Sequence, residues 1–118
     1  MRSPRRGEIW WTAFPTDPPD KGRRPVIVVS TDARNAHPRA NTVLVIPLST
    51  SIHSPGPSHL LLRAGETGLR EDSVACAENI SVVRKDQFGE PVQGHRVLSH
   101  MQICKLASLV KLAMACVG

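Results

Sequence analysis

The stretch from Arg23 to Ser30 constrains the fold most, because it reads Arg-Arg-Pro-Val-Ile-Val-Val-Ser. Residues 26–29 are all β-branched, and side chains that are stiff at χ1 favour a strand over a helix. Since this run is apolar at every position, the strand is expected to be buried on both faces. Pro25 lacks a backbone N–H and is therefore expected at the first residue of the strand. Arg23 and Arg24 should then lie at the rim of a sheet, where an anion can reach them.

Length and charge narrow the class of protein. The 118 residues predict one domain, 1–118, that buries a core without disulfides or a structural metal. The net charge is +5 and the sequence pI is about 9.7, with the excess of basic residues near the two ends. This excess favours a polyanionic partner, although the charge alone also fits a surface that only maintains solubility.

The cysteines and histidines give no sign of disulfides or of a metal site. No CxxC, HxxxH or HExxH spacing occurs, and Cys104 and Cys116 on one helix would lie about 18 Å apart. We therefore expect a reduced, cytoplasmic protein that uses no metal and no other cofactor. No apolar run approaches the roughly 20 residues of a membrane span, and residues 1–6 lack the apolar segment of a secretory signal, so no membrane partner is expected.

Hydrophobic patterning predicts a mainly β (α+β) fold that ends in one helix. Ser99 is the expected N-cap of this helix, with Gln102 at the spacing of a capping box. Because β and α elements do not alternate, the sheet should be small and strongly bent, or a barrel, with a single covering helix. The expected strand stretches are 8–14, 23–30 (with its first paired residue at Pro25), 42–48, 59–63, 73–83 and 92–98. The helix 99–117 is expected to bury Ile103, Leu106, Val110, Ala113 and Val117.

Three polar side chains stand out against these apolar strands. Arg24 precedes one buried strand, Ser49 ends another, and Glu78 lies midway along a third. Taken singly, each has an ordinary explanation: a solvated strand edge, a turn cap, and an acid paired with a basic neighbour. The other interpretation is that the three side chains share one site for an anionic ligand.

Five linked motifs resemble the MazF/PemK/Kid family of type II toxin endoribonucleases, or mRNA interferases, in order and spacing. The similarity runs from Arg6 to the final helix. The motifs are Arg6-Gly7-Glu8-Ile9-Trp10-Trp11, Arg23-Arg24-Pro25-Val26-Ile27-Val28-Val29-Ser30, Ile46-Pro47-Leu48-Ser49-Thr50-Ser51, Asp72-Ser73-Val74 and Ala77-Glu78-Asn79-Ile80.

The resemblance implies an SH3-like β-barrel, a homodimer, and the toxin of a toxin-antitoxin pair whose cognate, MazE-like antitoxin blocks the RNA groove. It also implies metal-independent, sequence-specific cleavage of single-stranded mRNA and other RNAs. A ribose 2′-OH attacks the adjacent phosphorus, which leaves a 2′,3′-cyclic phosphate and a 5′-OH.

The same resemblance implies roles for particular residues. Arg24 and Ser49 match the family's catalytic pair, and Glu78 matches an acid with a base or RNA-contacting role in some members. Because a guanidinium stays protonated, Glu78 is the favoured general base, with His59 as the second candidate. Cys76 departs from the family, since some members have a second arginine there. RNA contacts are predicted for Arg6, Lys21, Arg23, Thr50, His59 and Asn79.

Two other functions stay open at this point. One is a non-catalytic toxin of the same fold that binds a protein such as DNA gyrase, although gyrase-directed relatives carry a C-terminal Trp and this chain ends in Ala-Cys-Val-Gly. The other is a barrel that binds nucleic acid without turnover. Both predict that a long RNA remains intact in the presence of the protein.

Overall fold

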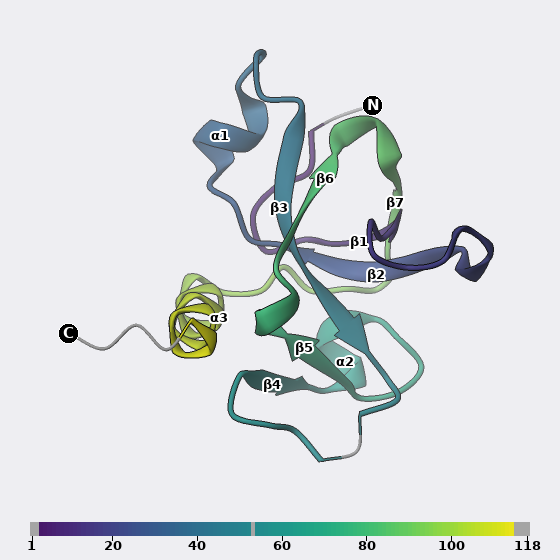
Figure 1. The fold of residues 1–118 in the computed structure, drawn as a ribbon, viewed down its shortest axis with the longest axis vertical. Helices are drawn as coiled ribbons and strands as arrows, with labels where there is room; N and C mark the ends of the chain where they lie inside the picture. The colour runs from purple at the N-terminus through teal and green to yellow at the C-terminus, as the bar shows by residue number, and fades with distance from the viewer. Residues whose placement is uncertain (1–2, 53, 115–118) are drawn as a thin grey trace.

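A computed structural model describes residues 3–52 and 54–114, which fold as a twisted antiparallel sheet with a long C-terminal helix (Figure 1). The strands are β1 (Ile9–Ala13), β2 (Arg23–Val28), β3 (Thr42–Ser49), β4 (His59–Leu62), β5 (Ser73–Cys76), β6 (Ser81–Arg84) and β7 (Phe88–Pro91). The α-helices are α1 (Asp32–Ala36), α2 (Ala64–Thr67) and α3 (His100–Ala113), and short 3-10 turns span Pro19–Lys21, Ala77–Asn79 and Lys85–Gln87. Among these helices, none is both long and apolar enough to cross a bilayer.

Strand β3 organises the sheet, whose strand order is β4-β5-β3-β2-β1-β7. One edge of β3 pairs with β2, and the other is shared, with β6 along Thr42–Val45 and β5 along Leu48–Ser49. Pro47, which has no N–H to donate, lies where the partner changes. The result is an open, barrel-like sheet, and the predicted mainly β fold with a C-terminal helix is confirmed.

Both faces of the central strands are buried, as the apolar run in β2 predicts. Val26 and Val28 pack on one face in a cluster with Trp10. Ile27, on the opposite face, belongs to a second cluster that includes Leu106 of α3. Helix α3 therefore covers one face of the sheet, which Figure 1 shows beside β5.

The prediction that Pro25 begins its strand is wrong, because β2 starts at Arg23. Over Arg23–Pro25 the strand pairs with β1 only, and its pairing with β3 begins at Val26 opposite Pro47. Pro25 is tolerated inside the strand because this part of β2 lies at an edge. The strand also ends early, at Val28, so that Val29 and Ser30 lie beyond it.

Two other strand predictions are corrected. The last strand is Phe88–Pro91, whereas residues 92–98 form no strand. The expected strand 73–83 is interrupted after Cys76 by a 3-10 turn, so Glu78 lies in that turn and not midway along a strand. Paired strands lie on both sides of the turn, and alternation of side chains cannot reveal such a break.

The capping box of α3 is confirmed. The Gln102 N–H donates to Ser99 Oγ at 3.1 Å, and the Ser99 N–H donates to Gln102 Oε1 at 2.9 Å. Ile103, Leu106 and Leu109 are the buried residues of α3. Of the other predicted positions, Val110 is half-buried beside the buried Leu109, Ala113 is exposed, and Val117 lies outside the described residues.

Candidate active site

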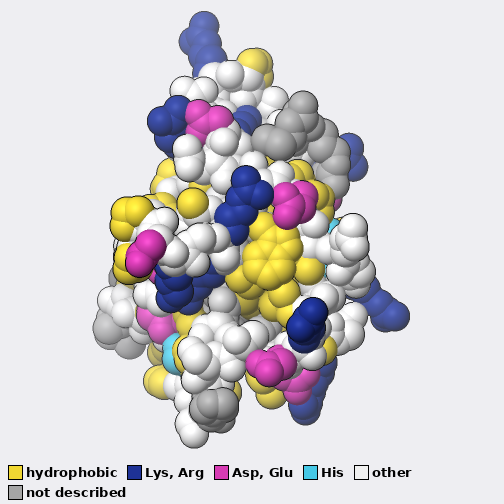
Figure 2. All heavy atoms as spheres, turned by 90° about the vertical axis from the view of Figure 1, so that its right-hand side faces the viewer, with side chains coloured by type: hydrophobic (Ala, Val, Ile, Leu, Met, Phe, Trp, Pro, Cys, Tyr) yellow, Lys and Arg dark blue, Asp and Glu magenta, His cyan; other side chains and the backbone are white. Residues whose placement is uncertain are grey.

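A pocket of about 820 Å³ opens between the β1–β2 loop, the end of β3 and the segments 68–71 and 90–93. On the face in Figure 2, an apolar area lies between basic and acidic side chains. The charged residues that line the pocket are Lys21, Arg23, Arg24, Arg70, Glu71 and Glu90, and the large apolar ones are Trp11, Pro25, Leu48, Leu69, Pro91 and Val92. The pocket thus combines an apolar lining with an excess of positive charge.

The side chain of Arg24 is held by three contacts. Its Nε donates to the Leu48 carbonyl oxygen at 3.5 Å, and its Nη1 forms an ion pair with Asp17 Oδ1 at 3.2 Å. Its Cζ lies 5.3 Å from the centre of the Phe14 ring, in cation-π contact. The side chain keeps 20% exposure, so the guanidinium is both ordered and accessible from the pocket.

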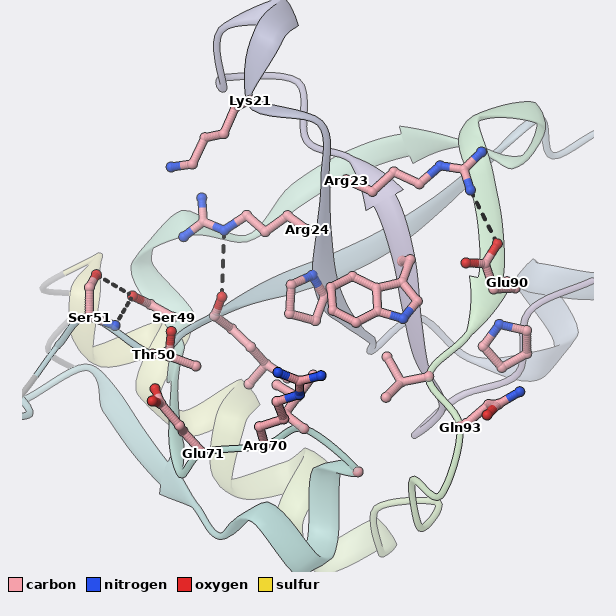
Figure 3. A pocket seen from close by; sticks show the side chains of 17 residues that line it. Lys21, Arg23, Arg24, Ser49, Thr50, Ser51, Arg70, Glu71, Glu90 and Gln93 are labelled. Carbon is pink, nitrogen blue, oxygen red and sulfur yellow. Dashed lines mark hydrogen bonds and ion pairs between the residues drawn. The ribbon is translucent and has the colours of Figure 1, made fainter.

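Ser49 reaches the same pocket from the end of β3 (Figure 3). If the pairing of Val26 with Pro47 is continued by two residues, Arg24 falls opposite Ser49. Ser49 Oγ lies 3.0 Å from Ser51 Oγ and accepts the Ser51 N–H at 3.3 Å, while Thr50 lies between them. The structure therefore brings Arg24 and Ser49 to one pocket wall, with two further hydroxyls beside them.

Arg23 points away from Arg24, toward the opposite side of the pocket (Figure 3). Its Nη1 lies 3.1 Å from Glu90 Oε2, and its guanidinium lies across the backbone of Gly89, where a β-carbon would collide with it. Successive residues of a strand face opposite ways, which separates the two arginines. Lys21 lies at the rim on the Arg24 side, with its Nζ 3.9 Å from Asp17 Oδ1.

Glu78 lies beside the pocket and is not one of its lining residues. Its Oε2 is 2.8 Å from His59 Nε2. Cys76 pairs with His59 across β4 and β5, and the charges of both Glu78 and Arg24 act on its thiol. Burial raises the pKa of the Cys76 thiol, the charge of Glu78 raises this pKa further, and Arg24 partly opposes the shift.

His59, Cys76 and Glu78 place potential metal-ligand atoms within 4.8 Å of one another. The Gly56 N–H donates to His59 Nδ1 at 2.8 Å, so Nδ1 carries no proton and Nε2 is the N–H that donates to Glu78. A histidine that binds a metal through Nε2 usually donates its other N–H to an oxygen, which is the reverse arrangement. The hydrogen bonds of His59 therefore favour a carboxylate-orienting role over metal ligation.

The segment 68–71 is held at the pocket by hydrogen bonds around α2. The Ala64 N–H donates to Asp72 Oδ1 and Arg63 Nη1 to Asp72 Oδ2, both at 2.9 Å, and these contacts lower the pKa of the Asp72 carboxyl. Gly68 caps α2 with a φ of +77°, and a β-carbon there would collide with the backbone of residues 93–95. Glycine is thus required for this pocket wall to approach residues 93–95.

Of the residues predicted to contact RNA, some line the pocket and others do not. Lys21, Arg23 and Thr50 line the pocket, whereas Arg6, His59 and Asn79 do not. The Arg6 N–H donates to Asp32 Oδ1 at 2.7 Å at the start of α1, and Asn79 is exposed in the same 3-10 turn as Glu78.

The sequence did not identify three residues of the site: Trp11 and Arg70, which line the pocket, and Asp17, which contacts Arg24. The alternation of a strand gave a signal for Trp11, because Trp10 is buried and its neighbour must face the other way. The loop residues Asp17 and Arg70 gave none, because their positions depend on how the loops fold against the sheet.

Comparison of the sequence with known proteins finds one matching family model and named relatives. The family model described as "PemK-like, MazF-like toxin of type II toxin-antitoxin system" matches residues 5–114. Endoribonuclease MazF9 of Mycobacterium tuberculosis is 33% identical over 96 residues, which cover 75% of this chain and 79% of the relative. Probable endoribonuclease MazF5 of the same organism is 35% identical over 80 residues, which cover 68% of this chain and 67% of the relative.

Solved structures share the fold at lower sequence identity. An endoribonuclease in complex with its cognate antitoxin, from Mycobacterial species, has a TM-score of 0.74 at 21% identity and covers 98% of this chain and 99% of its own. MazF from Deinococcus radiodurans has a TM-score of 0.75 at 17% identity, with coverage of 98% and 100%. These matches show that the chain has the fold of these solved structures.

Proposed function

Because this chain belongs to the PemK-like, MazF-like toxin family of type II toxin-antitoxin systems, we propose that it is a toxin endoribonuclease whose reaction takes place in the Arg24–Ser49 pocket. The observation that carries the proposal is the meeting of these two side chains on one pocket wall. Each lies at the end of a buried strand, so both are mounted on rigid elements. The names of this chain's relatives identify the reaction class as endoribonuclease, and the pocket supplies groups suited to that reaction.

The pocket suits a single-stranded RNA substrate. Lys21, Arg23, Arg24 and Arg70 can neutralise successive phosphates, while Trp11 and the pocket prolines offer apolar surface against which an unpaired base can stack. A duplex would keep its bases away from this lining. The proposed substrate is therefore unpaired RNA. The proposed location of the reaction is the cytoplasm.

Arg24 and Ser49 stabilise the charge that develops during cleavage. When the 2′-OH attacks phosphorus, negative charge grows on the non-bridging oxygens, and a planar guanidinium can donate to two of them. A fixed donor of this kind is worth about 10²–10³ in rate, by analogy with oxyanion holes. Ser49 Oγ adds a hydroxyl donor on the same side of the pocket.

Glu78 is the proposed general base, positioned by His59. The His59 imidazole donates a hydrogen bond to Glu78 Oε2, so Oε1 is the oxygen that would accept the 2′-OH proton. Because Glu78 does not line the pocket, this step requires the ribose to reach from the pocket to the Ala77–Asn79 turn. The departing 5′-oxygen takes its proton from water, which gives the 5′-OH product.

The substrate supplies its own nucleophile in this mechanism. A 2′-OH held next to phosphorus reacts as an intramolecular group, and such proximity offsets several kcal/mol of the barrier. The attack therefore needs no metal-bound hydroxide. The reaction is expected to proceed without a metal or another cofactor.

One substituted RNA tests the mechanism. A single deoxyribose at the cut position should leave binding unchanged and abolish cleavage there, whereas the all-ribose RNA should be cut in excess EDTA. The upstream fragment should end in a 2′,3′-cyclic phosphate, which mass spectrometry identifies. Cleavage of the substituted RNA at that position would show attack by water and would refute the mechanism.

An antitoxin is the proposed protein partner, since a solved structure of the same fold is an endoribonuclease in complex with its cognate antitoxin. An acidic, disordered segment would suit the basic rim and would exclude RNA from the pocket. Truncation of such a segment should then release inhibition. Full inhibition by the truncated antitoxin would refute pocket blocking.

A further inference from the structure

We infer that Asp17 is a positioning residue that holds Arg24 in the orientation required for catalysis, an inference that rests on the proposed function. Asp17 belongs to the β1–β2 loop and does not line the pocket. Its role is therefore exerted through Arg24, which does.

Phe14 and Asp17 together form a cradle for the guanidinium. The Asp17 N–H donates to the Phe14 carbonyl oxygen at 3.0 Å, and the Phe14 ring contacts Arg24. Phe14 is only 5% exposed and packs in the core cluster of Trp10 and Val26. The cradle is thus attached to a buried core cluster at one end and contacts Arg24 at the other.

The Asp17 carboxylate is more buried than the carboxylates of the surface ion pairs in this structure, such as that of Glu90. Its side chain is 10% exposed, and Oδ1 receives both the Arg24 contact and the longer Lys21 contact. Oδ2 is buried without a hydrogen-bond partner among residues 3–52 and 54–114. An unsatisfied buried oxygen destabilises a fold, so stability gives no reason for this placement. Control of Arg24 does give one.

The ion pair has opposite consequences for turnover and for RNA binding. It restricts the guanidinium to one orientation, which favours the transition state, because small misplacements of a catalytic group reduce the rate strongly. It also places a negative charge 3.2 Å from Arg24, which weakens the attraction for phosphate. Removal of the charge should therefore lower turnover while leaving RNA binding equal or tighter.

The variant Asp17→Asn tests this separation, with Asp20→Asn as the matched control. Asp20 is exposed in the same loop, so both variants change the net charge equally. Asp17→Asn should reduce kcat by about 10- to 100-fold, with an RNA Kd no weaker than that of Asp20→Asn. Asp20→Asn should keep kcat within about twofold of the parent protein. Asp17→Glu, which keeps the charge, should recover part of the lost turnover.

A second measurement reports on Arg24 without any reaction. The NMR signal of the Arg24 Nε–Hε group, assigned by its loss in Arg24→Lys, should show restricted motion in the parent protein and in Asp20→Asn. In Asp17→Asn the same group should be motionally averaged. Thermal unfolding of each variant identifies loss of the fold, in which case Asp17→Ser, which removes the carboxylate and its unsatisfied oxygen, replaces Asp17→Asn in both measurements.

The outcomes separate this inference from the proposed function. If the parent protein cuts no RNA, the proposed function fails, while the Nε–Hε comparison still decides whether Asp17 orders Arg24. If Asp17→Asn matches Asp20→Asn in kcat, or if Arg24 stays equally ordered in both, the positioning role is refuted. A loss of kcat that is equally large in an Arg24→Lys background would likewise refute it, because Asp17 would then act independently of Arg24.

Discussion

At the scale of single residues, Arg23 and Arg24 show how neighbours in one strand acquire different roles. Arg24 turns toward Ser49 and is held by Asp17, Leu48 and Phe14, whereas Arg23 turns toward Glu90 across Gly89. In the proposed function, the charge of both arginines contributes to RNA binding, and only the guanidinium beside Ser49 acts on the reacting phosphate. Substitution at the two positions should therefore affect different steps.

Arg24→Lys keeps the charge and loses the planar fork. We expect RNA binding to weaken by at most about tenfold and kcat to fall by about 10² or more, because bidentate donation matters most in the transition state. Binding titrations and single-turnover cleavage measure the two effects. Arg23→Lys is the matched control and should reduce kcat far less. Near-normal turnover by Arg24→Lys would remove Arg24 from the catalytic role.

Cys76 should be the less reactive of the two cysteines that the structure describes. Burial and the charge of Glu78 raise the pKa of its thiol, so the reactive thiolate is scarce at neutral pH and forms only as the pH rises above the ordinary cysteine value. Cys104 is exposed on α3. Alkylation followed by peptide mass spectrometry should therefore label Cys104 first at pH 7, and labelling of Cys76 should require more alkaline solution. Equal labelling at pH 7 would contradict the assigned environment.

At the scale of an element, α3 depends on its first turn. Ser99→Ala removes the side-chain acceptor for the Gln102 N–H and should lower the free energy of unfolding by about 1 kcal/mol. Ser108→Ala is the control on the same helix, because its hydroxyl donates to a helical carbonyl, that of Cys104, and should have little effect. Urea unfolding of the three proteins measures both. Equal stability of the two variants would show that the capping box contributes nothing.

At the scale of the whole molecule, the exposed apolar side chains of α3 favour self-association. On α3 itself Met101 is 82% exposed and Leu112 55%, and Met114 at the C-cap of the helix is 71% exposed. Together with the family membership, this supports the proposed homodimer. Trp10 is a core residue and adds nothing to such a surface. Light scattering at micromolar concentration should give twice the chain mass of 12.9 kDa, and a monomeric mass would contradict the proposal.

The sequence by itself determined the features that depend on short-range patterns. The β-branched run fixed a strand that is buried on both faces, and the Ser99–Gln102 spacing fixed the start of α3. Five linked motifs identified the family and pointed to Arg24 and Ser49, which do share a pocket. These signals are readable because each depends on neighbours a few residues apart.

Only the tertiary structure decided where the charged groups meet. Arg23 pairs with Glu90, 67 residues away, and Glu78 lies in a turn beside the pocket because the predicted strand breaks after Cys76. Asp17 reaches Arg24 through a proline-containing loop whose path no periodicity describes. Such contacts depend on strand register and on loop conformation, and both are fixed by packing across the whole sheet instead of by local residue preference.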